Sequence, residues 1–289
     1  MKNFSSIRKN IHIEALALGK FDGMHLAHRI LWGYLGKKGA LLCIENKKEH
    51  YLTPRNTKDI YTSYPLFYLP VRKVREKNGE EFVRVLCEKF PYLSRIVVGY
   101  DFRFGKNREF CANDLPKLFS KEVVIVPEYH IRGIGVHSTL IKDFIRIGDM
   151  AMANAMLGRL YCLQGKIIGG QNLGSKQLYA TINLETKGYV IPQEGVYATL
   201  SEVDDRIYPS VSFVGHRLST DRAFSIESHI LEEVIVLKKQ EAKIYFIQKI
   251  RDNQRFEHLN ELKNRISQDI AHAKDIFVQT KLHSILSPK

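Results

Sequence analysis

One short stretch near the N-terminus constrains the fold of this chain more than any other. Residues 19–28 read GKFDGMHLAH. The largely apolar run Ile11–Leu18 before them predicts a buried strand, and the amphipathic run Leu26–Leu35 after them predicts a helix. A strand that breaks at glycines and continues as a helix suits phosphate binding. Glycine lets the backbone come close to a phosphate, and the helix start offers unpaired N–H groups.

Two histidines lie at the opening turn of this predicted helix. His25 and His28 are three residues apart and therefore lie on one side of the turn. They could be a metal pair or occur by chance, but metal pairs on helices usually lie four residues apart, and no third ligand is evident nearby. Together with the glycines, the imidazoles predict a site that holds a triphosphate and stabilises its charge while a bond is exchanged.

This stretch resembles the G-x-F-D-G-x-H-x-G-H signature of nucleotidylyltransferases. The closest likeness is to the bacterial bifunctional riboflavin kinase/FMN adenylyltransferases, also called FAD synthetases. Residues 96–105, IVVGYDFRFG, resemble the V-V-G-x-D/N-F-x-F-G segment of that family, and residues 136–142, VHSTLIK, resemble its I-S-S-T-x-I-R segment. The likeness continues to about residue 270. Three segments in the expected order are far more specific than one.

The first half of the chain alternates strand-like and helix-like runs, which predicts an α/β fold with a parallel sheet and helices on its faces. The resemblance implies that this fold is a Rossmann-like nucleotidylyltransferase domain. In such sheets ligands gather at the carboxyl ends of the strands. The histidine turn and the turn at Asp101 each follow a strand, so we expect both to reach one crevice. The expected strands are Ile11–Leu18, Ala40–Ile44, Leu66–Leu69, Arg95–Val98 and Glu122–Val126, with helices at Leu26–Leu35 and Gly79–Phe90.

After Gly158 the pattern changes, and we expect two domains, residues 1–158 and 159–289. Helical runs from Ser138 to Ile147 and from Asp149 to Gly158 close the first. Short extended runs separated by turn residues predict a small antiparallel β-barrel in the second. A one-sided apolar stripe predicts a closing helix around Leu262 and Ile266. The expected barrel strands are Tyr161–Ile168, Gly195–Leu200, Val211–Val214, Phe224–Leu231 and Lys243–Ile250.

The composition favours anionic small molecules as partners. Lys and Arg number 44 against 31 Asp and Glu, a net charge of +13. The basic clusters are short and dispersed, and no nucleic-acid-binding signature is present, so nucleotide phosphates are expected rather than nucleic acid. Four widely spaced cysteines predict reduced thiols in a cytoplasmic protein. No apolar run approaches the roughly 18 residues of a membrane span, and no signal peptide is evident.

For the first domain, the resemblance implies adenylyl transfer from ATP to FMN, with pyrophosphate leaving together with Mg²⁺. His25 and His28 are expected to contact the ATP phosphates and to stabilise the transition state. Taken alone, the Ser138-Thr139 pair could merely cap a helix, and Asp101 could merely form a turn. The residues expected to shape the ATP site or to bind its phosphates are Gly19, Phe21, Asp22, Gly23, Asp101, Ser138, Thr139 and Lys142.

Four positions depart from the family pattern in these segments. Ala27 replaces a glycine, Lys20 an asparagine, His137 a serine and Lys142 an arginine. The last change keeps the charge but loses bidentate contact with phosphate. We expect all four to tune activity without abolishing it.

For the second domain, the resemblance implies phosphorylation of riboflavin by ATP. Residues 174–183, GSKQLYATIN, correspond to a glycine- and arginine-rich loop that leads to P-T-A-N. Thr181 and Asn183 match that motif, and their oxygens are expected to hold Mg²⁺ and ATP phosphates from one face of a strand. Ala180 stands in place of the proline, Ile182 in place of the alanine and Leu178 in place of the preceding glycine, which makes this the weakest match in the chain.

The general base of the kinase is expected at Glu227. Residues 225–231, SIESHIL, resemble the family's V-E-x-H-I/L segment, in which the glutamate takes the proton from the ribityl hydroxyl. Gly174 and Arg217 complete the residues expected at the kinase ATP and flavin site. Taken alone, Glu227 would be read as an exposed strand carboxylate.

The sequence thus predicts synthesis of FAD from FMN and ATP, together with formation of FMN from riboflavin and ATP, with Mg²⁺ at both sites. Three alternatives stay open. The barrel could bind flavin but phosphorylate it weakly or not at all, or the first domain could act on another phosphorylated acceptor. The chain could also be a basic nucleic-acid-binding protein with a non-catalytic nucleotidylyltransferase fold. The oligomeric state is not predicted.

Overall fold

The computed structural model describes residues 2–3, 12–46, 50–168, 181–219, 221–231 and 239–280. Contacts divide the chain into two compact units, Met1–Ser138 and Thr139–Lys289. This division falls after the first residue of α4 (Ser138–Arg146) and before α5 (Met150–Leu157), and α5 contacts two barrel strands. The domain boundary predicted at residue 158 stays a prediction.

The first unit is built on a parallel sheet of six strands in the order β1-β4-β3-β2-β5-β8. The predicted strands are confirmed to within a few residues, except that the first begins at Ala15. The strands are β1 (Lys2–Asn3), β2 (Ala15–Gly19), β3 (Gly39–Glu45), β4 (Leu66–Pro70), β5 (Arg95–Gly99) and β8 (Glu122–Val126).

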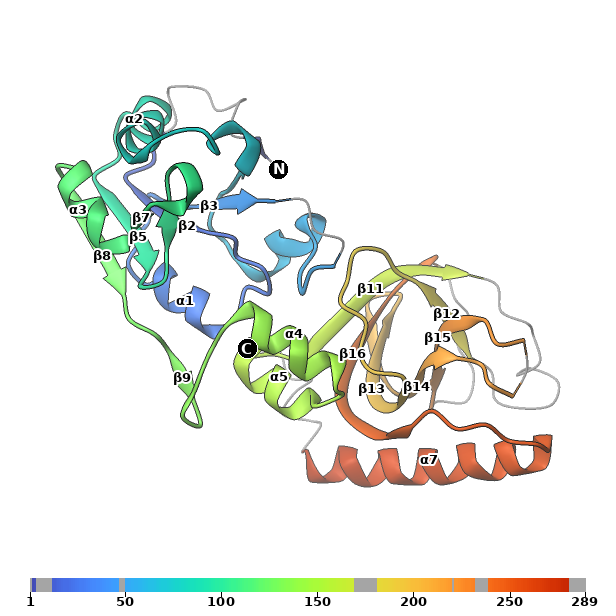
Figure 1. Ribbon diagram of the computed structural model, residues 1–289. Coiled ribbons are helices and arrows are strands. Elements are labelled where there is room, and N and C mark those ends of the chain that lie inside the picture. Colours follow the sequence, from blue (N-terminus) through green and yellow to red (C-terminus); the bar gives the residue numbers. More distant parts are fainter. Residues whose placement is uncertain are drawn as a thin grey trace. The chain divides into compact units, whose positions relative to one another are not determined.

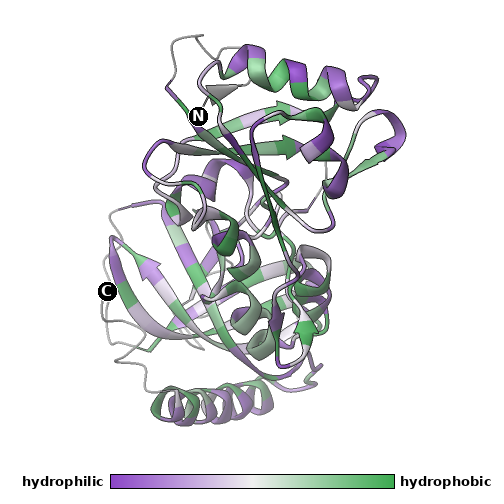
Figure 2. Cartoon of the chain, turned by 90° about the vertical axis from the view of Figure 1, so that its left-hand side faces the viewer, coloured by the Kyte–Doolittle hydropathy of each residue, from purple (hydrophilic) through white to green (hydrophobic). Residues whose placement is uncertain are grey.

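Both faces of this sheet are covered, as the near-continuous apolar runs of its strands require. Leu16 and Leu18 pack with helices α2 (Gly79–Lys89) and α3 (Leu115–Leu118) on one face. Ala15 and Ala17 pack on the other face with the residues around α1 (Leu26–Trp32). Figure 1 shows α1 and α2 on opposite sides of the sheet, and in Figure 2 its strands are mainly hydrophobic.

The order of the strands creates a switch point beside β2. From β2 the chain moves outward through β3 and β4, and it then returns to β5 and β8 on the other side. Ligands in open α/β sheets bind at such a point, outside the carboxyl ends of the strands. The two turns that follow Gly19 and Gly99 therefore lie at the binding edge of the sheet.

Smaller elements of the first unit were not predicted. Two short hairpins pair β6 (Arg103–Phe104) with β7 (Phe110–Cys111) and β9 (His130–Ile131) with β10 (Ile134–Gly135). The 3₁₀ helices are η2 (Arg55–Tyr61), η3 (Val71–Lys73), η4 (Lys106–Arg108) and η5 (Ala112–Asp114).

The second unit contains the predicted antiparallel barrel. Six strands close in the order β11-β12-β15-β14-β13-β16. The strands are β11 (Tyr161–Ile168), β12 (Ile182–Glu185), β13 (Gly195–Val203), β14 (Arg206–His216), β15 (Phe224–Ile230) and β16 (Glu241–Asp252).

A closed ring of five hydroxyl groups lies inside the barrel, each fully buried. Ser212 donates to Ser228 at 2.8 Å, and the ring continues through Ser201 at 2.8 Å and Ser210 at 2.9 Å. Thr199 closes it, 2.8 Å from Ser210 and 2.7 Å from Ser212. Each hydroxyl of the ring has two hydroxyl neighbours within hydrogen-bond distance, and Thr199 Oγ1 also donates to the backbone oxygen of Ser210 at 3.2 Å. This satisfies groups whose burial would otherwise be costly.

The predicted closing helix is α7 (Leu259–Gln279), which covers the outer face of β13, β14 and β16. Ala273, Ile276 and Phe277 pack there against Val196 and Ala198. The helix is correspondingly two-sided in hydropathy (Figure 2).

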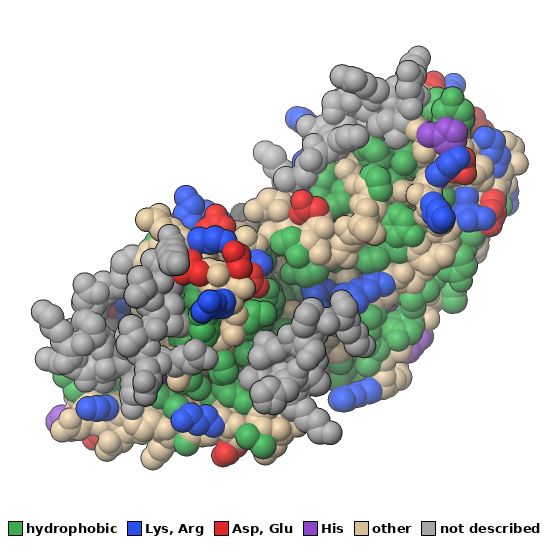
Figure 3. All heavy atoms as spheres, turned by 180° about the vertical axis from the view of Figure 1, so that it is seen from behind, with side chains coloured by type: hydrophobic (Ala, Val, Ile, Leu, Met, Phe, Trp, Pro, Cys, Tyr) green, Lys and Arg blue, Asp and Glu red, His purple; other side chains and the backbone are tan. Residues whose placement is uncertain are grey.

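On the face that Figure 3 presents, Lys and Arg side chains lie in several separate groups, some of them beside Asp and Glu side chains. Among the described residues, no helix is long and apolar enough to cross a membrane.

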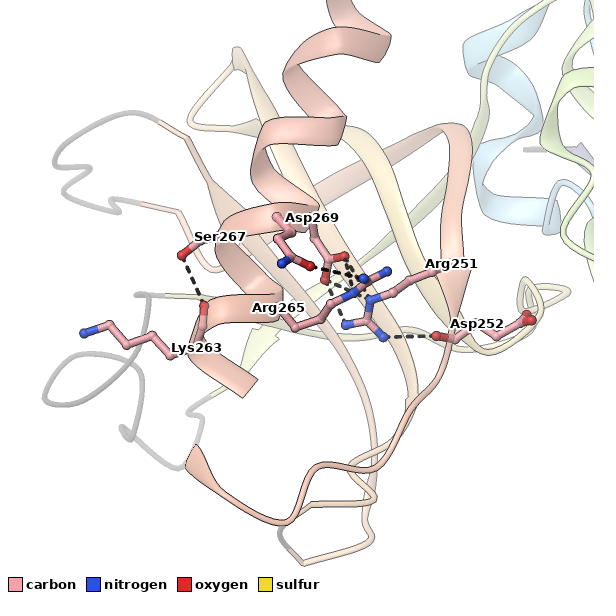
Figure 4. A network of polar contacts seen from close by, with 7 residues as sticks. Arg251, Asp252, Lys263, Arg265, Ser267 and Asp269 are labelled. Atoms are coloured by element: carbon pink, nitrogen blue, oxygen red, sulfur yellow. Dashed lines mark hydrogen bonds and ion pairs between the residues drawn. The ribbon is translucent and has the colours of Figure 1, made fainter. Parts of the chain in front are cut away.

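A buried ion pair joins α7 to the barrel. Arg251 of β16 donates from Nε and Nη2 to the carboxylate of Asp269 at 2.8–3.0 Å, and the Asp269 residue is 2% exposed. Figure 4 shows Asp269 reaching Arg251, with Arg265 of the same helix beside it. The geometry is bidentate, which is the strong form of this contact.

Candidate functional site

The turn after β2 holds an unusual backbone conformation. Phe21 has φ 49° and Met24 φ 47°, and both side chains are fully buried. Left-handed conformations of such residues cost about 1–3 kcal/mol each and persist only where the surroundings hold them. Gly23 adopts φ 91° between them, which only glycine accepts without strain.

The carboxylate of Asp22 is one of the groups that hold this turn. Its Oδ1 accepts the backbone N–H of Leu52 at 2.8 Å and that of Thr53 at 3.3 Å, and the residue is 5% exposed. Asp22 therefore ties the turn to the segment before η2. Its predicted part in ATP binding stays a prediction.

The hydroxyl of Ser138 joins the same turn from the start of α4. Ser138 Oγ donates to the backbone oxygen of Asp22 at 2.7 Å and lies 3.2 Å from His25 Nε2. A hydroxyl has one proton, and a carbonyl can only accept it. The Nε2–H of His25 is therefore the donor to Ser138 in this arrangement.

The two predicted histidines lie against each other. The rings of His25 and His28 stack with centroids 3.6 Å apart and 19° between their planes. The edge of Phe21 meets His28 at 5.1 Å. The two imidazoles therefore lie as one stacked pair at the start of α1.

The second turn at this sheet edge, after β5, contributes Tyr100 and Asp101. Asp101 is exposed. Tyr100 Oη lies 3.4 Å from His137 Nε2, which contacts Glu128 Oε1 at 2.7 Å. Hydrogen bonds from His137 and Tyr100 hold the pKa of Glu128 below its usual value. The sequence marked His137 only as a departure from the family pattern. It did not mark Glu128, because nothing local in the sequence sets the end of β8 apart from other strand ends.

The predicted helix at Ser138 is confirmed, but only its first residue belongs to the first unit. Thr139 is exposed and Lys142 is buried at 7% exposure, both in the second unit. Their part in the ATP site stays a prediction.

In the barrel, strand register brings two predicted kinase residues together. Asn183 of β12 lies directly opposite Glu227 of β15, and Asn183 is 8% exposed. Thr181 is exposed immediately before β12. Gly174 and Ala180 lie outside the described residues.

Arg217 connects Glu227 to a further acid. Its Nη1 donates to Glu227 Oε1 at 3.2 Å, while Nε and Nη2 contact Asp221 at 2.9 and 2.7 Å. Hydrogen bonds from the Ala223 N–H and from Arg217 keep the pKa of Asp221 below its usual value. Asp221 was not predicted, because nothing local in the sequence marks it as the partner of Arg217.

The donor groups at the barrel site suit Mg²⁺. Asn183 and Thr181 offer neutral oxygens, and Mg²⁺ takes oxygen ligands, among them several waters and the phosphates of a substrate. The described residues contain no cluster of three or more His, Cys, Asp or Glu placed to hold a metal on their own. A magnesium ion here would therefore depend on the nucleotide.

Residues 157–277 match the family described as riboflavin kinase. The bifunctional riboflavin kinase/FMN adenylyltransferase of Buchnera aphidicola (from Acyrthosiphon pisum) is 28% identical over 309 residues, which cover 95% of this chain and 96% of that protein. The protein of the same name from Escherichia coli K12 is 26% identical over 292 residues, with coverages of 92% and 93%.

A solved structure shares the whole fold. It is described as a macrolide-efflux protein from Streptococcus pneumoniae and superposes with a TM-score of 0.83 at 22% identity, over 95% of this chain and 97% of its own. At that identity the likeness shows the fold alone.

Proposed function

Since this chain belongs to the family of bifunctional riboflavin kinase/FMN adenylyltransferases, we propose that its first unit transfers an adenylyl group to FMN and its barrel phosphorylates riboflavin. The chain uses ATP, riboflavin and FMN as substrates and makes FAD. The contact between His25 and Ser138 is the main support for an adenylyl-transfer site in the first unit. It joins the turn after β2 to the start of α4 at the switch point of the sheet.

Adenylyl transfer joins two anions, so positioning and charge stabilisation are its main requirements. A phosphate oxygen of FMN attacks the α-phosphorus of ATP, and the bond from that phosphorus to the bridging oxygen breaks to release pyrophosphate. His25 and His28 would bind the ATP phosphates and stabilise the charge of the transition state. The glycine turn would let its backbone approach the nucleotide. Mg²⁺ would neutralise charge on the leaving pyrophosphate.

In the barrel, the terminal ribityl hydroxyl would attack the γ-phosphorus of ATP while Glu227 accepts its proton. The bond from that phosphorus to the bridging oxygen would break to release ADP. Arg217 would orient that carboxylate through the contact at 3.2 Å. Thr181 and Asn183 would hold Mg²⁺ with the ATP phosphates, and Mg²⁺ would neutralise charge on the transferred group. The register that sets Asn183 opposite Glu227 supports a common site for metal and base.

We place the protein in the cytoplasm. All four cysteines are free thiols, as is usual in a reducing compartment.

Flavin chromatography tests the function directly. Purified protein is incubated with ATP and Mg²⁺, and with either riboflavin or FMN. We expect FAD from both substrates, FMN as an intermediate from riboflavin, and loss of both reactions when EDTA removes Mg²⁺. Formation of FAD from FMN but not from riboflavin would show that the barrel lacks kinase activity. No FAD from either substrate would contradict the proposed function.

A further inference from the structure

Lys58 is a buried cation next to the turn that carries the histidines. It lies on the 3₁₀ helix η2, and 2% of the residue is exposed. Its Nζ donates to the backbone oxygen of Lys20 at 3.0 Å. Lys20 is the first residue after β2, so this contact holds the point where the turn begins.

The charge of Lys58 is not balanced by a carboxylate within the part of the chain that the structure describes. Its other close neighbour is the ring of Tyr68, 5.9 Å from Nζ. Arg55, on the same helix, differs in this respect, because it pairs with Glu45 at 2.9 Å. A buried ammonium with one carbonyl partner is unfavourable for stability. Stability of the fold therefore does not explain why a lysine is buried at this position.

The conformation of the turn after β2 offers an explanation for the buried lysine. Phe21 and Met24 are held in the left-handed region, and this requires fixed surroundings. The contacts described above, from Leu52, Thr53 and Ser138, all end on Asp22. Lys58 adds a contact to Lys20, so the turn is held at two separate points.

We propose that Lys58 is a positioning residue for adenylyl transfer. Its ammonium fixes the Lys20 carbonyl and thereby the turn that presents His25 and His28, and its unbalanced positive charge favours a polyanion bound at that turn. Lys58 touches neither substrate. The inference rests on the proposed function of the first unit.

The test compares Lys58→Met, which keeps the length of the side chain but removes charge and donor, with Lys58→Arg, which keeps both. Lys37→Met is the matched control, because Lys37 is exposed just before β3. The kcat and KM for FAD formation from FMN, the riboflavin kinase rate and the thermal unfolding midpoint are measured on each full-length protein.

We expect Lys58→Met to lower the kcat for FAD formation about 10- to 100-fold, as misplaced catalytic groups do. The KM for ATP should change less than kcat, the kinase rate should stay within about twofold, and the unfolding midpoint should not fall, since an unbalanced buried charge is removed. Lys58→Arg should recover most of the rate. Lys37→Met should match the wild-type protein.

Two results would overturn the role of Lys58. One is an unchanged kcat in Lys58→Met. The other is a joint loss of unfolding midpoint and both activities, which would show a merely structural residue. A wild-type protein that makes no FAD from FMN would instead refute the proposed function, so the two failures are distinguishable.

Discussion

His25 Nε2 lies 3.2 Å from Ser138 Oγ, although 113 positions separate the two residues in the chain. Because the Ser138 proton is directed to the Asp22 carbonyl, the imidazole of His25 is oriented with its Nε2–H toward the hydroxyl. Ser138 therefore connects α4 to the turn and sets the tautomer of His25. This is a more specific role than capping a helix.

Ser138→Ala removes the acceptor of that hydrogen bond. We expect the rate of FAD formation from FMN to fall about fivefold, which corresponds to one hydrogen bond of about 1 kcal/mol. Riboflavin phosphorylation in the same protein should not change. The measurement is kcat/KM for both reactions against pH, because an altered His25 tautomer should shift only the profile of the first. Identical profiles would show that Ser138 does not act through His25.

His28→Ala removes one ring of the stack and the contact with Phe21. The loss of a group that stabilises developing charge should lower the rate of FAD formation by about 10²–10³-fold. The kinase rate serves as the internal control and should be nearly intact. Equal losses of both activities would mean that the two sites are not separable.

Glu227→Gln should give the opposite pattern. Without a carboxylate to accept the ribityl proton, the kinase rate should fall about 10²–10⁴-fold, while FAD formation from FMN continues. Glu241→Gln, at an exposed position at the start of β16, is the matched control. A kinase rate unchanged by Glu227→Gln would remove this residue as the base.

Asp269→Asn removes the counter-charge of Arg251, whose side chain is 12% exposed. Breaking one side of a buried ion pair destabilises a domain by about 3–5 kcal/mol. Urea unfolding followed by far-UV circular dichroism should show the barrel unfolding at a lower concentration, and kinase activity should be lost before adenylyl transfer. Asp275→Asn, exposed on the same helix, should unfold like the wild-type protein. Coincident unfolding of Asp269→Asn and Asp275→Asn would contradict the role of the pair.

Ser212→Ala opens the hydroxyl ring and leaves Thr199 and Ser228 without one partner each. Buried polar groups that lose a partner cost about 1–3 kcal/mol each, so the barrel should be destabilised by at least that amount. Ser267→Ala, at an exposed position on α7, is the control. A denaturation midpoint for Ser212→Ala equal to that of Ser267→Ala would show that the ring contributes little.

Local patterns in the sequence predicted much of this structure. Apolar runs, short extended runs between turn residues and helical spacing located the five main strands of the first unit and most strands of the barrel. Gly158 ends α5 in a left-handed conformation, as expected of a glycine at a helix end. Helix α1 ends at Trp32, earlier than the predicted Leu35, although Leu35 is still buried. These features depend on residues close together in the chain, and for that reason they could be predicted.

The amino-acid sequence by itself determined the order of the elements, the glycine turn after β2 and the chemical groups near it. Only the tertiary structure decided which of those groups meet. Strand register set Asn183 opposite Glu227, and packing at the sheet edge brought Lys58 to Lys20 and Ser138 to His25. The contact between Arg251 and Asp269 likewise depends on the packing of α7 on the barrel. Such contacts join residues that are distant in the chain, and they form only when apolar burial aligns whole strands and helices, which no local pattern specifies.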